Sequence, residues 1–294
     1  MNRKMIILAI VALALVSLAC SININLPITT VKTGPTVTEN INVPFLAEKQ
    51  ATADVTLNFG AGKLNLQPGA TNELISGTAT YNVTDFKPVV TIDSNNINIE
   101  QANLKLTNIP AFNENIINDW NFSFGNSPMS LVIKAGAYTG NFELGGLSVH
   151  RLEVTDGASK VNLSFSKPNL VEMTTLKYTT GASRVTLTGL GNANVTDLSF
   201  SGGAGNYTLD FSGQLNRNMT VSIDAGVSTV TVIVPAGVPA QLTTDGSLIT
   251  VNTSGGWEQT GNTYQLSGSG NTITILAKMG AGSLRLETSR QGIK

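Results

Sequence analysis

The sequence is poor in three kinds of residue that many functions require. It has one cysteine, one histidine and few charged side chains among its 294 residues. A single thiol and a single imidazole exclude a zinc finger, a zinc site of three histidines, a Cys–His protease pair and a disulfide framework. Charged residues make up only 13% of the chain, and 18 Lys and Arg face 19 Asp and Glu. That balance leaves no basic patch typical of nucleic-acid binding, so we expect no nucleic-acid partner.

The sequence does contain enough apolar material to fold. Hydrophobic residues make up 41% of the chain and the net charge is −1, so it lacks the composition of a disordered protein. Aromatic residues are few, at 6%, whereas glycine occupies 29 positions. This composition predicts one extended domain or two smaller ones.

The N-terminus has the features of a secretory signal. Residues 2–4 are Asn-Arg-Lys, and a run of fifteen mostly apolar residues follows from Met5 to Ala19. Because a membrane-spanning helix needs about 20 such residues, the run favours a cleaved signal peptide over residues 1–19, and an uncleaved anchor is the alternative.

The only cysteine, Cys20, follows this run directly. Its position behind a small residue resembles a bacterial lipobox, in which a signal peptidase cuts before a cysteine that then receives lipid. Lipid on Cys20 would supply more than one acyl chain, which stable anchoring requires. We therefore predict an exported lipoprotein, attached through Cys20 to the outer face of a bacterial membrane in the cell envelope.

An internal repeat occupies most of the remaining chain. Each copy has an apolar alternation, a glycine, a small residue and a second apolar alternation, as in LEVTDGASKVNLSF from Leu152. Between Gly136 and Gly246 the glycines are separated by 21, 24, 22, 23 and 20 residues, which is typical of a repeat architecture. The expected corner glycines are Gly60, Gly136, Gly157, Gly181, Gly203, Gly226, Gly246 and Gly280.

The positions of the apolar residues relative to each glycine are nearly constant. They stand five and three before it and four and six after it, as Leu152, Val154, Val161 and Leu163 do around Gly157. Alternation of period two places these side chains on one face of a strand. We expect the strand to turn at the glycine, because glycine tolerates a positive φ.

The copy at Gly246 differs from the others. Its apolar residues Ile249 and Val251 follow at three and five positions instead of four and six. A shift of one residue would turn the strand to the wrong face, so we expect a bulge or a shortened corner here.

These patterns predict an all-β fold. A β-solenoid, in which each turn of about 22 residues stacks on its neighbour at about 4.8 Å, and a stacked β-sandwich both fit strands of this length. The fixed register over many copies favours the solenoid. We divide the chain into a signal peptide (1–19), a tether (20–50), an N-terminal β region or cap (51–130) and the solenoid repeats (131–289).

The predicted cap contains a group of aromatic residues. Phe112, Trp120, Phe122 and Phe124 lie in a segment without a corner glycine, and Trp257 lies near the other end of the chain. We expect them to shield the ends of the stack, as repeat arrays require. A binding role is the alternative.

Few residues suggest chemistry. His150 is the sole histidine and is expected on the polar face of a strand. The run from Gly202 is similar to a calcium-binding nonapeptide repeat, but Tyr207 occupies the place of the liganding Asp, so we predict no metal site. No nucleophile elbow and no phosphate-binding loop occurs. We predict no catalytic residue and no cofactor.

Three aspartates near the corners allow one enzymatic alternative. Asp156, Asp224 and Asp245 lie beside corner glycines, and in a solenoid they could align as a column of carboxylates. Such a column with a basic residue would suit a polysaccharide-active β-helix. Other copies carry uncharged residues there, and Asp is also common at turns.

The repeat resembles the toast-rack family of bacterial envelope proteins. The resemblance rests on GAGKLNL at Gly60, on the run from Leu131 to Phe165 and on GAGSLRLE at Gly280, and it covers roughly residues 50–288. Some copies depart from the usual GAG triplet, with Tyr138 or Ser159 as its third residue. The resemblance implies an exported, membrane-tethered and non-catalytic protein with a β-solenoid-like stack.

Three functions from different classes remain open. The first is a structural or adhesin-like interaction module whose polar strand faces bind a protein or a glycan. The second is an accessory of envelope-stress signalling that binds a membrane regulator. The third is the polysaccharide-active β-helix.

Overall fold

The computed structural model describes residues 33–48, 51–101, 116–246 and 248–289. This part of the chain is almost entirely β-structure, with two short 3₁₀ helices, η1 (Thr84–Phe86) and η2 (Leu190–Ala193). It contains no helix that is long and apolar enough to span a membrane. The strands are β1 (Val37–Val43), β2 (Ala53–Ala70), β3 (Ile75–Tyr81), β4 (Pro88–Asp93), β5 (Asn96–Gln101), β6 (Asn118–Gly125), β7 (Met129–Glu143), β8 (Val149–Ser164), β9 (Met173–Thr188), β10 (Val195–Asp210), β11 (Met219–Pro235), β12 (Ala240–Asp245), β13 (Leu248–Thr253), β14 (Glu258–Thr260), β15 (Thr263–Leu266) and β16 (Ile273–Ser289).

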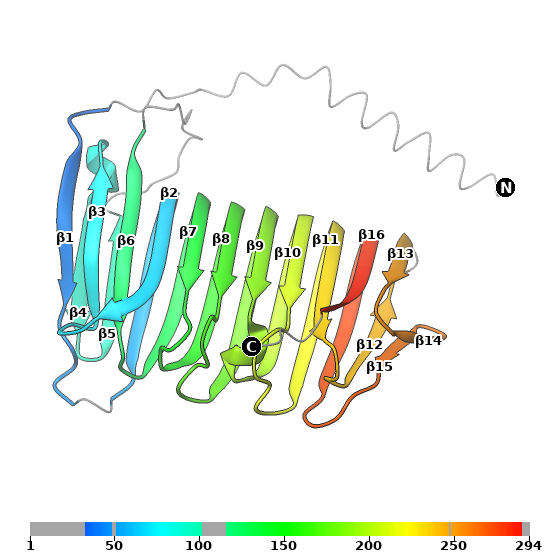
Figure 1. Cartoon of the computed structure of the whole chain (residues 1–294). Coiled ribbons are helices and arrows are strands. Elements are labelled where there is room, and N and C mark those ends of the chain that lie inside the picture. Colours follow the sequence, from blue (N-terminus) through cyan, green and yellow to red (C-terminus); the bar gives the residue numbers. More distant parts are fainter. Residues whose placement is uncertain (1–32, 49–50, 102–115, 247, 290–294) are drawn as a thin grey trace, which may run out of the picture. The chain divides into compact units, whose positions relative to one another are not determined.

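Seven long strands form the centre of one large sheet (Figure 1). They pair in parallel in the order β2-β7-β8-β9-β10-β11-β16. Each contains one of the predicted corner glycines, and the register aligns equivalent residues, as between Ala158 and Ala182. The predicted all-β, β-solenoid-like stack of repeats is therefore confirmed.

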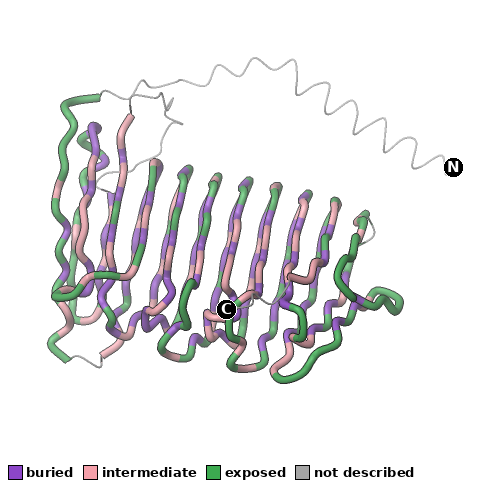
Figure 2. The backbone as a smooth tube through the Cα atoms, in the orientation of Figure 1, coloured by how far each residue is buried: buried purple, intermediate pink, exposed green. Residues whose placement is uncertain are grey.

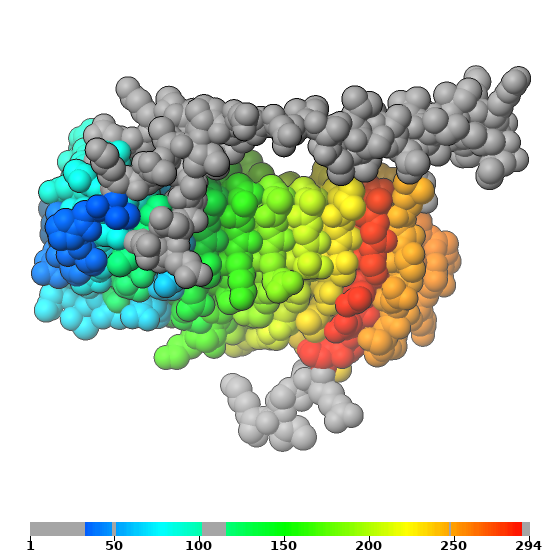
Figure 3. Space-filling model, turned by 90° about the horizontal axis from the view of Figure 1, so that it is seen from above, coloured from blue at the N-terminus to red at the C-terminus, as the bar shows by residue number. Residues whose placement is uncertain are grey.

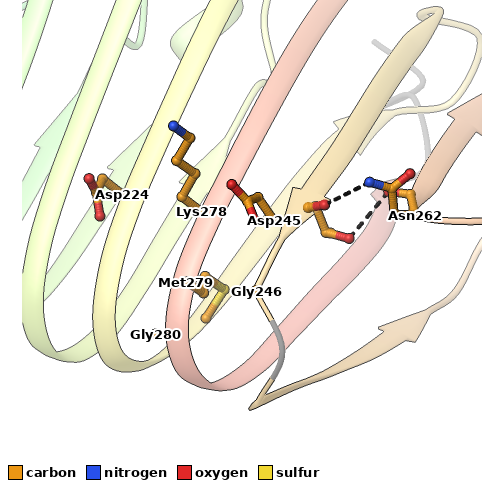
Figure 4. Close-up of a pocket in the computed structure, with 8 residues that line it drawn as sticks. Asp224, Asp245, Gly246, Asn262, Lys278, Met279 and Gly280 are labelled. Atoms are coloured by element: carbon orange, nitrogen blue, oxygen red, sulfur yellow. Dashed lines mark hydrogen bonds between the residues drawn. The ribbon is translucent and has the colours of Figure 1, made fainter.

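The inward side chains change phase at each glycine. In β8, Leu152 and Val154 before the glycine and Val161 and Leu163 after it are all buried, with at most 1% exposure. Two buried sets of opposite parity can share one core only if the strand bends between them, and the ribbons bend there (Figure 4). Each long strand thus contributes its first half to one layer, called the first layer, and its second half to the second layer. The core fills the space between them, and buried residues alternate with more exposed ones along the long strands (Figure 2).

Separate, shorter strands extend both layers at the β2 end. The first half of β2 pairs with β5, which pairs with β4, and the second half pairs with β6, followed by β3 and β1. Trp120, Phe122 and Phe124 of β6 point into the core and are at most 1% exposed. The alternative of a binding role is therefore wrong for these three rings, while Phe112 lies outside the described residues.

The last strand of the chain is not the last in the stack. β16 pairs with β11 on one side and with β12 and β13 on the other. Figure 3 shows it as a red band between the yellow β11 and the orange strands. The Gly246 copy forms two separate strands, β12 and β13. Their register with β16 is continuous all the same, from Asp245 opposite Lys278 to Leu248 opposite Ala281, with two residues between these pairs on each strand. The expected bulge or shortened corner is therefore wrong, because Gly246 stands one residue before the position that Gly280 occupies in β16.

Candidate functional site

The corner glycines form a column across the stack. A Cβ on Gly136 would lie 2.4 Å from the carbonyl oxygen of Gly60, and one on Gly181 would lie 2.5 Å from that of Gly157. None of the seven corner glycines in the long strands has a positive φ, whereas Gly246, which stands outside this column, has a φ of 159°. Glycine is required here by the close approach of neighbouring backbones, and not by the positive φ that the pattern suggested. The column continues through Gly203, Gly226 and Gly280. A Cβ on each would lie 2.7, 2.7 and 3.2 Å, respectively, from the carbonyl oxygen of the corner glycine on the preceding strand of the stack.

The three aspartates near the corners do not form a column. Asp156 stands one residue before its glycine, in the inward phase, and is 6% exposed. Asp224 stands two residues before Gly226, in the outward phase, and is exposed. Asp245 is exposed as well, because it pairs with Lys278, which stands two residues before its own corner glycine, Gly280. The carboxylate column is therefore wrong, and one carboxylate is separated from the other two.

The two outward aspartates flank a lysine at the end of the stack (Figure 4). Asp224 pairs in register with Lys278, which pairs with Asp245 on its other side, so the three lie on adjacent strands. They line a shallow pocket whose far wall is Asn262. The Asn262 Nδ2 donates to the carbonyl oxygen of Thr244 at 3.0 Å, which ties the β14–β15 turn to β12.

One ammonium lies between the two carboxylates of this pocket. It offsets the charge of one of them, which weakens the attraction for a divalent cation. No cluster of three or more metal-ligating side chains occurs among the residues described. Lys278 had no place in the sequence prediction, although its position two residues before Gly280 matches that of Asp224 before Gly226.

Asp156 accepts hydrogen bonds from three hydroxyl groups inside the core. The Oη of Tyr178 donates to it at 2.7 Å and the Oη of Tyr138 at 3.2 Å, and Thr180 Oγ1 also donates. The Ser183 Oγ lies 2.6 Å from Thr180 Oγ1 and extends the network. The hydroxyl groups replace the water that a buried carboxylate loses, which is the condition for keeping such a group in a core.

The tyrosines of this network keep their protons. Burial raises the pKa of Tyr138 well above its ordinary value of 10.0, and the neighbouring charge of Asp156 raises it further. Burial likewise raises the pKa of Tyr178, with further increases from Tyr138 and Asp156. Both phenols thus remain hydrogen-bond donors, and the cluster stabilises the corner of the stack.

His150 lies at the start of β8, away from these aspartates. Its Nδ1 is 3.3 Å from the carbonyl oxygen of Glu172, and the side chain is partly exposed. It takes part in a backbone contact between neighbouring strands. Cys20, the predicted lipidation site, lies outside the described residues.

The outer face of the second layer carries one long row of polar side chains. Its members are register partners on eleven strands, from β1 at one end to β13 at the other. At about 4.8 Å per strand, the row is about 48 Å long. We call it the amide–hydroxyl row, and its members in spatial order are Asn40, Thr78, Asn121, Asn65, Asn141, Asn162, Thr186, Thr208, Thr231, Arg285 and Asn252.

Solved structures with similar folds come from several bacteria. A candidate cell adhesion protein from Clostridium sporogenes is 20% identical, and the match covers 87% of this chain and 100% of that one, with a TM-score of 0.48. A candidate adhesin from Bacteroides fragilis is 11% identical over 86% and 97% of the two chains, with a TM-score of 0.35. A candidate lipid-binding protein from Parabacteroides distasonis is 10% identical over 85% and 97%, with a TM-score of 0.38.

No curated protein matches the sequence. The profile of a known family does: the one described as the N-terminal domain of toast_rack matches residues 32–175 and 169–233. Together these matches include more than half of the chain and most of the long strands. The chain belongs to the toast-rack family.

Proposed function

We propose that this chain is a non-catalytic protein of the bacterial cell envelope, anchored by lipid on Cys20, that acts as a structural, adhesin-like interaction module. The observation that carries the proposal is the amide–hydroxyl row. Amide and hydroxyl groups at regular intervals over about 48 Å form an extended flat surface of the kind that stacked repeats use for binding. The second layer therefore serves as the binding face.

Binding by this face is tested with isolated envelopes. The soluble Cys20→Ser chain should be retained by envelope preparations in a saturable way. A double substitution that places charge in the row, Asn162→Glu with Thr208→Glu, should abolish retention. The matched control, Thr155→Glu with Ser201→Glu, makes the same change on the first layer and should retain binding. Equal retention by all three proteins would overturn the assignment of the binding face.

The anchor is tested separately. The full chain, expressed in a bacterium with radiolabelled palmitate, should take up label and sediment with the membranes, and Cys20→Ser should do neither. Absence of label on the unsubstituted chain would contradict the lipoprotein proposal. This result is independent of the binding face, because it measures label on Cys20 and not retention by the amide–hydroxyl row.

The pocket at Asp224 favours one competing function. Two carboxylates beside an ammonium are the groups that a polysaccharide-active β-helix would use. In that case incubation with acidic polysaccharides would shorten the polymers, and Asp224→Asn with Asp245→Asn would stop the reaction. We expect no change in polymer length with either protein, and shortening that depends on these two residues would overturn the non-catalytic proposal.

A further inference from the structure

Two cations stand side by side at the centre of the second layer. Lys160 of β8 and Arg184 of β9 are register partners on neighbouring strands, and both are exposed. Neighbouring strands are about 4.8 Å apart, so two like charges at this spacing repel each other. Their partners on the next strands are Thr139 and Asn206, which are uncharged. The carboxylate of Asp119 lies in the same row but three strands from Lys160, where it pairs with Lys63.

The polar side chains around these cations have no hydrogen-bond partner among the described residues. Within the described part of the chain, the side chains of this group make no hydrogen bond or ion pair with the protein. They project from four adjacent strands, β7 to β10, in two neighbouring rows of the second layer. We call this group the Lys160–Arg184 patch, and it consists of Thr139, Asn141, Lys160, Asn162, Arg184, Thr186, Asn206 and Thr208.

The same rows behave differently toward the β1 end of the layer. There the Asn65 Nδ2 donates to the Asn121 Oδ1 at 2.8 Å, and Lys63 pairs with Asp119 at 3.8 Å. Those side chains satisfy one another across the strands. The patch also has amides and cations, but it has no carboxylate and no such partners, so its donors and acceptors are available to a ligand.

We propose that the Lys160–Arg184 patch binds an acidic polysaccharide; this deepens the proposed interaction function and rests on it. The two cations bind carboxylate or phosphate groups of the polymer, for which the planar guanidinium of Arg184 is especially suited. The surrounding amides and hydroxyls bind sugar hydroxyl groups. The flat surface suits an extended polymer, because small-molecule sites are concave. The patch offers no aromatic ring on which nucleic-acid bases would stack.

The test measures binding of the soluble Cys20→Ser chain to three polymers. Polygalacturonate supplies carboxylates, phosphomannan supplies phosphates, and dextran is the neutral control. We expect binding to at least one acidic polymer and none to dextran. Lys160→Gln with Arg184→Gln should weaken binding by about ten-fold or more, because the variant loses two charged donors to the acidic groups of the polymer. Asn162→Ala, which keeps both cations, should weaken it less.

A matched double variant controls for total charge. Lys134→Gln with Lys177→Gln removes two exposed lysines from the first layer and should leave the affinity unchanged. Equal weakening by both double variants, equal binding of dextran, or no binding of either acidic polymer would overturn the patch. If any of these results occurs but envelope preparations still retain the chain through the amide–hydroxyl row, only this inference fails. If retention is also absent, the proposed interaction function fails with it.

Discussion

Gly181 packs directly against Gly157: a Cβ on Gly181 would lie 2.5 Å from the carbonyl oxygen of Gly157. Backbone atoms of a paired strand cannot move aside as a flexible side chain can. The substitution Gly181→Ala must therefore push β8 and β9 apart at the corner. We expect the free energy of unfolding to fall by about 1–3 kcal/mol, the usual cost of overpacking, measured by urea denaturation.

Gly157→Ala is the matched comparison. Its Cβ would lie 3.2 Å from the carbonyl oxygen of Gly136, so a shift of a few tenths of an ångström is sufficient. We expect a smaller loss than for Gly181→Ala. Equal losses would show that the closeness of the approach within the column does not set the cost.

The alternation of apolar residues was enough to predict the long strands and their core. It was also enough to predict that Asp156 is buried and Asp224 exposed, because one stands one residue and the other two residues before its glycine. The place of β16 could not be predicted, since the order of copies along the chain does not specify their order in space. The interrupted copy at Gly246 cannot offer β11 a continuous partner, whereas the unbroken β16 pairs with it along its whole length.

Tyr178 tests the buried network around Asp156. Tyr178→Phe removes the hydrogen bond of 2.7 Å to the carboxylate while keeping the ring in the core. Because a buried acceptor then loses a partner, we expect a loss of about 1–3 kcal/mol in the free energy of unfolding. Tyr138→Phe removes a longer bond of 3.2 Å and should cost less. An unchanged free energy of unfolding in Tyr178→Phe would mean that Asp156 does not depend on this donor.

The same tyrosine predicts how stability changes at high pH. Burial raises the pKa of Tyr178 in the folded state, while the unfolded chain titrates near 10.0. The contribution of the folded phenol is fully present below pH 10 and is lost as the pH rises through the folded pKa. Above pH 10, Tyr178→Phe should reduce the slope of unfolding free energy against pH by about 1.4 kcal/mol per pH unit. Identical slopes for the two proteins would contradict the burial of the phenol.

Glu143 predicts a change at acidic pH. Its burial alone would raise the pKa of the carboxyl, but hydrogen bonds from Ser164, Ser166 and Gly145 lower it below 4.5 overall. A lowered pKa in the folded state adds stability above the pKa of the unfolded chain, and this is lost as the pH falls through the folded value. The difference in unfolding free energy between the unsubstituted chain and Glu143→Gln should therefore be larger at pH 7 than at pH 3. A constant difference would rule out this linkage.

Asn169 ties the loop between β8 and β9 to the start of β8 and is 3% exposed. Its Oδ1 accepts from the amide of Val149 at 2.9 Å, and its Nδ2 donates to the carbonyl oxygens of Val149 and Val171, each at 2.8 Å. Asn169→Asp keeps the shape but replaces the donor with a charged oxygen facing two carbonyl groups. We expect a loss of more than about 1–3 kcal/mol at pH 7, because two acceptors lose their donor and a charge is buried.

Acid should partly restore the stability of Asn169→Asp relative to the unsubstituted chain. Protonation removes the charge and returns one donor to the side chain. Asn192→Asp is the matched control, because the Asn192 Nδ2 donates to a single carbonyl oxygen, that of Phe165 at 2.9 Å, and the side chain is only partly buried. Thermal unfolding at pH 7 and pH 4 should show a larger recovery for Asn169→Asp than for Asn192→Asp. The reverse order would mean that neither the burial of the charge nor the number of lost donors sets the cost.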